Sequence, residues 1–182
     1  MNNYYNKSYL AWQKKAGLYG AAQDTKYYRD LIKPDDTVLD FGCGGGYILE
    51  SLPGQKKYGV DINKAALQLA HAKGIKTYTS LSLLPRNITF DVIITHHTLE
   101  HVDNPYEMLL LLKKRLKKNG LLIGVLPIDD WRNQKDYRMN DINNHLYTWT
   151  PLLIRNLLVR AGFTIKSVSL ILTIFFIERE FS

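Results

Sequence analysis

The stretch VLDFGCGGGYI, residues 38–48, sets an apolar run that ends in an acid directly before four glycines in five positions. A dinucleotide-binding loop has the spacing G-x-G-x-x-G. The sixth position of that pattern is Tyr47 when it begins at Gly42 and Leu49 when it begins at Gly44, so the spacing does not fit. The stretch instead reads D-x-G-x-G-x-G. Glycine backbone approaches a ligand closely and accepts positive φ, which favours a nucleoside-binding loop after a buried strand.

An alternation of strand and helix patterns runs through the chain. Strands are predicted at 37–41, 58–62, 76–79, 90–95 and 121–126. Helices are predicted within 1–33, from residue 47, and at 64–73, 106–118 and 151–161. This alternation predicts an α/β fold with a mainly parallel sheet covered by helices on both faces. Ligands of such sheets bind beyond the carboxyl ends of the strands.

The C-terminal segment is rich in β-forming residues but lacks turn residues. No glycine, proline or asparagine lies between 165 and 180, and these are the residues that most often form turns. The sequence therefore leaves open whether the final strand is displaced or missing.

Length and composition indicate a single domain. The 182 residues can build one full core, and we expect 1–33 to form a helical cap and 128–148 a loop that covers the substrate. One cysteine, Cys43, excludes an internal disulfide. The N-terminus has no apolar signal segment, and no apolar stretch approaches the roughly 20 residues of a membrane helix. We therefore expect a cytoplasmic protein with no membrane partner.

The net charge of +7 permits an acidic partner such as nucleic acid or a phosphorylated substrate. The lysines are dispersed, however, apart from the run KKRLKK at 113–118. We interpret that run as the solvated end of a helix, because cations favour helix C-termini. The short chain leaves no room for an RNA- or protein-recognition domain. We therefore expect a small-molecule partner and consider nucleic acid unlikely; the oligomeric state is not indicated.

Five segments, in order, resemble the motifs of the class I S-adenosylmethionine-dependent methyltransferases. They are VLDFGCGGG, YGVDI, LLPRNITFDVIITHHTLEHV, LKKNGLLIGVLP and HLYTWTPLLIRNLLVRAGF. The resemblance covers about 37–162. It implies the Rossmann-like three-layer sandwich of that family, with an antiparallel C-terminal strand, and S-adenosylmethionine as the cofactor.

The resemblance also implies which residues contact the methionine part of the donor. Gly42 and Gly44, with Cys43 between them, would pass this part, and the Cys43 side chain is expected to pack rather than react. Asp40 would help to place the donor's amino group, and Thr95 would lie near that group.

Residues after the second and third strands would contact the nucleoside part of the donor. Asp61 ends a strand 21 residues after Asp40, where a carboxylate can accept both hydroxyls of a ribose. By resemblance, Ile62 would lie against the adenine, and Ser80 and Leu81 would meet its edge. Many relatives carry an acid where Ser80 stands, which puts that contact in question.

Two histidines are candidate bases. Methyl transfer from a sulfonium is an in-line displacement, and a hydroxyl acceptor must also lose its proton, commonly to a histidine. His97 follows the fourth strand, and His145 lies in the loop expected to cover the site. The alternative for His145 is that it ties this loop to the core.

The segment after the fourth strand could also bind a metal. His97, Glu100 and His101 have the spacing i, i+3, i+4 and would share one face of a helical turn. They resemble the E-x-x-E-H motif of ubiquinone-pathway O-methyltransferases, where such residues can hold a divalent metal, but His97 replaces the first glutamate. We expect no metal here, and interpret Glu100 and His101 as fixing the turn.

The sequence thus predicts methyl transfer from S-adenosylmethionine to a small-molecule acceptor, at an oxygen. Two alternatives remain. An RNA or protein methyltransferase is supported by the net charge of +7, and a non-catalytic protein that binds S-adenosylmethionine would show the same donor motifs.

Overall fold

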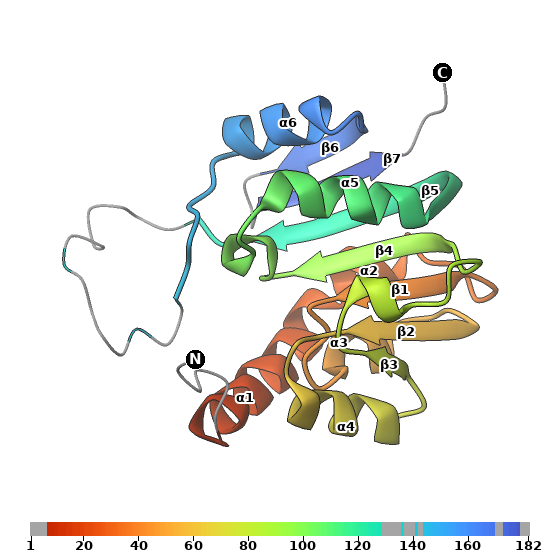
Figure 1. Ribbon diagram of the computed structural model, residues 1–182, viewed down its shortest axis with the longest axis vertical. Coiled ribbons are helices and arrows are strands. Elements are labelled where there is room, and N and C mark those ends of the chain that lie inside the picture. Colours follow the sequence, from red (N-terminus) through yellow and green to blue (C-terminus); the bar gives the residue numbers. More distant parts are fainter. Residues whose placement is uncertain (1–6, 129–135, 137–140, 142–143, 170–172, 179–182) are drawn as a thin grey trace.

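The computed structural model of the chain describes residues 7–128, 136, 141, 144–169 and 173–178 (Figure 1). Its central element is a seven-stranded sheet in the order β3-β2-β1-β4-β5-β7-β6. The strands are β1 (Thr37–Phe41), β2 (Lys56–Val60), β3 (Lys76–Tyr78), β4 (Phe90–His96), β5 (Leu116–Leu126), β6 (Thr164–Ser169) and β7 (Thr173–Glu178). Strands β1 to β5 pair in parallel. The predicted α/β fold with a mainly parallel sheet is confirmed.

Helices lie on both faces of this sheet (Figure 1). They are α1 (Lys7–Asp24), α2 (Lys26–Arg29), α3 (Tyr47–Ser51), α4 (Lys64–Ala72), α5 (Pro105–Arg115) and α6 (Pro151–Arg160), with the 3₁₀ turns η1 (Leu81–Leu83) and η2 (Leu99–His101). One apolar cluster joins the sheet to α5 and α6, and a second joins it to α2, α3 and α4. Within the described part of the chain, none of the helices is long and apolar enough to cross a membrane.

Side-chain caps fix where three helices begin. The Asn63 side chain accepts from the N–H groups of Ala65 and Ala66, at the predicted start of α4. The Thr150 hydroxyl accepts from the N–H of Leu153, at the predicted start of α6. Asn104 caps α5 in the same way. Each cap satisfies backbone donors that have no partner inside the helix.

The basic run at 113–118 differs from the prediction. Helix α5 ends at Arg115, not at Lys118, and the chain passes directly into β5. The Arg115 guanidinium lies beneath the connection from β3 to β4 and donates to four of its carbonyl oxygens, those of Leu81, Leu84, Pro85 and Ile88. The interpretation of this run as a solvated helix end was therefore wrong for Arg115, because its donors serve carbonyls that are distant in sequence.

The C-terminal segment forms two strands. Strand β7 pairs antiparallel with β5 on one side, from Leu121↔Glu178 to Leu126↔Thr173, and with β6 on the other. Pairing along both sides fixes the position of β7 without a turn-forming residue in the segment. The connecting residues, 170–172, lie outside the described part. The final strand is thus neither missing nor displaced, and it has the antiparallel direction expected from the resemblance.

The topology brings the ends of β1, β2 and β4 together. Parallel strands present their carboxyl ends at one edge of the sheet, where Figure 1 shows the arrowheads of β4 and β5. The glycine loop follows β1, Asp61 follows β2 and His97 follows β4. The segments singled out in the sequence therefore meet at this edge.

Candidate active site

The glycine loop has a backbone that only glycine adopts without strain. Gly42, Gly44 and Gly46 have φ values of 85°, 49° and 73°, in the left-handed region that L side chains disfavour. A Cβ at Gly42 would also overlap the side chain of Thr98 in the turn after β4. The loop is attached to β2 by the N–H of Gly42, which donates to the carbonyl oxygen of Val60 at 2.8 Å.

Asp61 holds this loop in place. Its Oδ2 accepts from the N–H of Gly44 at 2.8 Å, and its Oδ1 accepts from the N–H of Asn63 at 2.8 Å. Burial raises the pKa of Asp61, and the two N–H donors act in the opposite direction. The sequence suggested only a ribose contact for Asp61, so its structural role was missed. Each carboxylate oxygen still has a lone pair for a ligand hydroxyl.

Asp40 and Thr95 are buried at the ends of β1 and β4. Asp40 is 2% exposed, and neither its Oδ1 nor the Thr95 hydroxyl has a hydrogen-bond partner within the described residues. Burial raises the pKa of Asp40 to about 8, and the Asp61 carboxylate adds to the rise. Buried polar atoms without partners are rare in proteins. A bound cation with N–H donors, such as an ammonium group, would satisfy the Asp40 carboxylate.

A cavity of about 600 Å³ opens beside the loop. Of the residues singled out in the sequence, seven line it: Gly42, Asp61, Ile62, Ser80, Leu81, His97 and His101. Asp40, Cys43, Gly44, Thr95 and His145 are not among the lining residues. Such a volume is typical of a small-molecule site.

Three of the predicted donor contacts have distinct surroundings. Ile62 is 64% exposed, so its side chain is available to a ligand. The hydroxyls of Ser80 and Ser82 are 2.8 Å apart, and both residues line the cavity. Cys43 is buried, and its sulfur would lie only 2.6 Å from a Cβ at Gly59. The thiol therefore packs the loop against β2.

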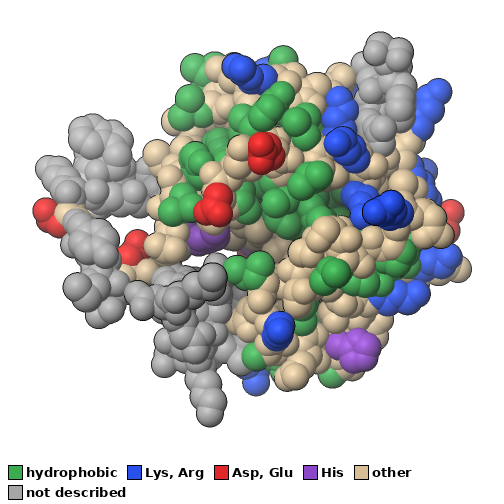
Figure 2. Space-filling view, in the orientation of Figure 1, with side chains coloured by type: hydrophobic (Ala, Val, Ile, Leu, Met, Phe, Trp, Pro, Cys, Tyr) green, Lys and Arg blue, Asp and Glu red, His purple; other side chains and the backbone are tan. Residues whose placement is uncertain are grey.

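The cavity lining is not basic. Its charged residues are Asp61 and Asp103, and no lysine or arginine is among the lining residues that the structure describes. On the face in view, Figure 2 shows acidic side chains and a histidine beside the hollow, and most Lys and Arg side chains lie away from it. In the described part of the chain, positive charge thus does not concentrate at the cavity.

His97 has a strained backbone at the cavity wall. Its φ is 48°, a conformation uncommon for residues other than glycine and often found at functional sites. Its N–H donates to the carbonyl oxygen of Val125 at 3.0 Å. The ring is 41% exposed, and its Nδ1 lies 3.4 Å from Oε1 of Glu100.

Glu100 is the centre of a small polar cluster. Its side chain is 0% exposed, and within the described residues neither oxygen has a hydrogen-bond partner. Nε2 of His101 lies 4.0 Å from Oε1. The backbone carbonyl of Glu100 accepts from the N–H groups of Leu146 and Tyr147, which joins the η2 turn to the segment before α6.

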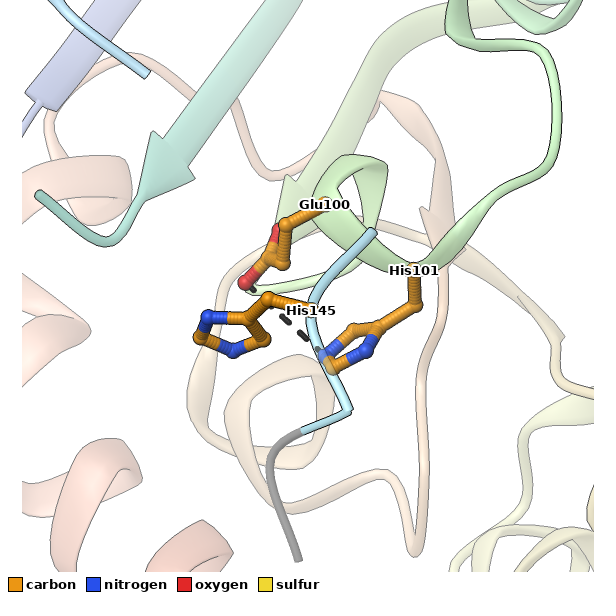
Figure 3. A group of neighbouring side chains, drawn as sticks. All are labelled: Glu100, His101 and His145. Atoms are coloured by element: carbon orange, nitrogen blue, oxygen red, sulfur yellow. Dashed lines mark ion pairs between the residues drawn. The ribbon is translucent and has the colours of Figure 1, made fainter. Parts of the chain in front are cut away.

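His145 enters the cluster from that segment (Figure 3). Its ring centroid is 4.9 Å from that of His101, and one ligand atom from each of Glu100, His101 and His145 lies within 4.8 Å of the others. His145 thus packs beside the cavity wall. Two imidazoles and a carboxylate are ligands that zinc accepts, whereas magnesium prefers oxygen ligands.

The sequence analysis missed a second polar cluster, formed by Tyr28, His96 and Asp24. Oη of Tyr28 lies 2.7 Å from Nδ1 of His96, and Nε2 of His96 lies 3.4 Å from Oδ2 of Asp24. Burial lowers the pKa of His96 and raises that of Tyr28. These contacts join α1 and α2 to the end of β4. No local spacing could have revealed them, because Tyr28 and His96 are 68 residues apart.

The comparisons with known proteins agree with this geometry. Residues 10–168 match the family model described as "Methyltransferase domain". A ubiquinone biosynthesis O-methyltransferase of Rickettsia canadensis is 32% identical over 137 residues, which is 70% of this chain and 56% of the relative. A mitochondrial protein of the same description from Candida albicans is 33% identical over 116 residues, 55% of this chain and 36% of the relative. The chain thus spans about half or less of these relatives.

Solved structures show the same fold at low identity. Magnesium protoporphyrin IX methyltransferase from Synechocystis, with bound SAH, has a TM-score of 0.68 at 19% identity, covering 91% of this chain and 84% of its own. A SAM-dependent methyltransferase from Aquifex aeolicus has a TM-score of 0.66 at 18% identity, covering 93% of this chain and 96% of its own. At these identities the likeness bears on the fold alone.

Proposed function

Because the chain belongs to the methyltransferase-domain family, within the class I S-adenosylmethionine-dependent methyltransferases, we propose that it methylates an oxygen of a small molecule. One observation supports this proposal above the others: the glycine loop, the Asp61 carboxylate and the His97 ring meet at one cavity of about 600 Å³. The similar curated proteins from Rickettsia canadensis and Candida albicans are O-methyltransferases by name. Among the described residues the cavity lining has no lysine or arginine, which favours a small acceptor over a nucleic acid.

The methionine part of the donor would lie over the glycine loop. The φ values of Gly42 and Gly44 keep bare backbone at this surface, with the buried Cys43 thiol supporting it from below. The Asp40 carboxylate, which has an unpartnered oxygen, would receive the donor's ammonium group. The hydroxyl of Thr95 would lie close to the same group.

The nucleoside part would occupy the cavity. Asp61 would accept the ribose hydroxyls with the lone pairs that its two backbone donors leave unused. The exposed Ile62 side chain would cover one face of the adenine, and Ser80 and Leu81 would meet its edge. S-adenosylmethionine bound in this way supplies a methyl group on a positively charged sulfur.

His97 is the base that the geometry supports. It lines the cavity and is 41% exposed, whereas His145 packs on His101 beside the wall. His97 takes the proton of the acceptor hydroxyl while the acceptor oxygen bonds to the methyl carbon. A positioned base of this kind contributes about 10²–10⁴-fold.

We propose that two further segments cover the bound donor and acceptor. Residues 1–33 would cap the donor site, and 128–148 would cover the acceptor; most of the latter lie outside the described part. We also propose that the protein is cytoplasmic.

Donor binding and transfer can be tested in one series. The purified chain is titrated with S-adenosylmethionine by calorimetry, then incubated with methyl-labelled donor and a panel of phenols, other small hydroxyl compounds, RNA and protein. Label on a small hydroxyl compound supports the proposal. Donor binding with no transfer identifies a non-catalytic donor-binding protein, and label on RNA or protein alone identifies the other alternative.

A further inference from the structure

We infer that Glu100 is the positioning residue of His97: its buried carboxylate holds the ring with Nδ1 protonated and leaves Nε2 bare toward the acceptor. The inference deepens the proposed O-methyl transfer and rests on it. The E-x-x-E-H resemblance does not imply such a pair, because the first position of that motif is an acid and here is His97.

The burial of Glu100 requires a partner. A carboxylate without solvent or hydrogen bonds is unfavourable unless a donor or a cation compensates it. Within the described residues, the groups at ion-pair distance from Glu100 are two imidazoles, with Nδ1 of His97 at 3.4 Å and Nε2 of His101 at 4.0 Å. The nearer ring is that of His97.

His97 and His101 differ in whether a ring nitrogen remains without a polar contact. His101, which also lines the cavity, has Nε2 4.0 Å from Oε1 of Glu100 and Nδ1 3.4 Å from the carbonyl oxygen of Asn144, so each of its nitrogens already faces a protein oxygen. Within the described residues, the His97 ring has one polar contact, from Nδ1 to Glu100, besides its edge contact with the His96 ring. Nε2 of His97 therefore remains for chemistry.

The strained backbone of His97 supports a defined ring position. A positive φ in a residue with a side chain persists only where surrounding contacts hold it. Here the N–H of His97 donates to the carbonyl oxygen of Val125, near the end of β5, and the ring lies with Nδ1 3.4 Å from Oε1 of Glu100 in the η2 turn. Two neighbouring elements thus fix the residue from opposite ends.

With this pair, proton transfer to His97 accompanies methyl transfer to the acceptor. The acceptor O–H bond breaks and its proton goes to Nε2 of His97, while the acceptor oxygen forms the new bond to the methyl carbon. The electron pair of the carbon–sulfur bond remains on sulfur, which loses its positive charge. The imidazolium that results lies against the Glu100 carboxylate, an arrangement that also fixes the tautomer beforehand.

A divalent metal at Glu100, His101 and His145 is the competing explanation, because their ligand atoms lie within 4.8 Å of one another. In that case Glu100 would serve the metal and His145 would be essential. If chelation abolishes transfer and zinc or manganese restores it, the positioning role of Glu100 is overturned.

The first test needs no acceptor. Nitrogen-15 NMR of the histidine-labelled full chain reports which ring nitrogen carries the proton, and the His97 signals are assigned by their loss in His97→Asn. We expect Nδ1–H with bare Nε2 in the wild type, and a shift toward Nε2–H in Glu100→Met, which keeps the volume but removes the acceptor. A bare Nδ1 in the wild type, or an unchanged tautomer in Glu100→Met, overturns the inference.

The second test is kinetic. Glu100→Met should lower kcat about tenfold or more and leave the acceptor KM and the donor Kd within about threefold. His97→Asn/Glu100→Met should be no slower than His97→Asn alone, because Glu100 acts through His97. A double variant that is much slower than His97→Asn alone would contradict this role for Glu100. The exposed residues Glu107 and His71 provide the matched controls Glu107→Gln and His71→Asn. If no acceptor is methylated, the proposed function fails, while the NMR result still decides the pairing.

Discussion

The backbone N–H of Gly44 donates to Oδ2 of Asp61 at 2.8 Å, so the residue proposed to hold the donor's ribose also fixes the loop beneath the donor. Binding and loop stability therefore depend on one carboxylate. A substitution at Asp61 should affect both, and the two effects can be measured separately.

Asp61→Ala should weaken S-adenosylmethionine binding by more than about tenfold, because charged hydrogen bonds are worth about 1.5–3 kcal/mol each. It should also lower the free energy of unfolding by about 1–3 kcal/mol, because the N–H groups of Gly44 and Asn63 lose their acceptor. Calorimetry and urea unfolding measure the two effects. Asp35→Ala, in the exposed turn before β1, is the control. Unchanged affinity in the folded variant would refute the ribose placement.

The raised pKa of Asp40 should make the stability of the fold depend on pH. Its pKa is raised by burial from 3.8 to about 8, so between these values the folded state holds a proton that the unfolded state releases. Stability should therefore fall as pH rises from about 4 to about 8. Asp40→Asn should flatten this decline and add about 1 kcal/mol or more to the free energy of unfolding at pH 8. Urea unfolding across this range checks it, and parallel curves for the two proteins would argue against a buried neutral Asp40.

The same group links pH to donor binding. An ammonium group favours the ionised form of Asp40, so donor affinity should rise with pH up to about 8 and binding should release a proton. Calorimetry in buffers of different ionisation enthalpy measures that proton. In Asp40→Asn the affinity should be lower and less dependent on pH. Binding without proton release near pH 7 would place the ammonium group elsewhere.

A comparison of Gly74 with Gly42 distinguishes the cost of a strained backbone from the cost of a steric overlap. Gly74 has φ 81°, and a Cβ added there would meet nothing within 4 Å, whereas a Cβ at Gly42, φ 85°, would overlap Thr98. Gly74→Ala should cost about 1–2 kcal/mol of stability, from the left-handed backbone alone. Gly42→Ala should cost more and abolish donor binding. Thermal unfolding and calorimetry compare them; equal losses and intact binding in Gly42→Ala would show that the loop need not approach Thr98 or the donor.

The histidine comparison tests the base. His97→Ala should lower turnover about 10²-fold or more and leave donor affinity within a few fold. His145→Ala should lower turnover less, because its ring packs on His101 beside the cavity wall. Initial rates at saturating donor measure both. A larger loss in His145→Ala than in His97→Ala would make His145 the base.

The sequence predicted the elements whose signals are local. The run TVLDF forms β1 with the predicted bounds, and the Asn63 and Thr150 caps begin their helices where expected. The spacing of Gly42, Gly44 and Gly46 identified the three positions of the glycine loop that take positive φ. Composition and short-range pattern decide these features, because each depends on neighbours within a few residues.

The features that the sequence did not predict depend on distant contacts. Helix α5 ends at Arg115, and the side chain of that residue donates to carbonyl oxygens 27 to 34 residues away. The pairing of Tyr28 with His96, and the packing of His145 on His101, likewise join segments that no periodicity relates. Strand β7 is specified by the two strands that flank it rather than by a turn.

A crystal structure of the chain with the demethylated donor bound is the most direct test of the site. We predict the ribose hydroxyls on the Asp61 carboxylate, the adenine between Ile62 and Leu81, and the His97 ring within roughly 6–8 Å of the sulfur, which leaves room for the methyl group and one acceptor oxygen. A ligand bound outside this cavity, or a His97 ring turned away from the sulfur, would contradict the proposed site.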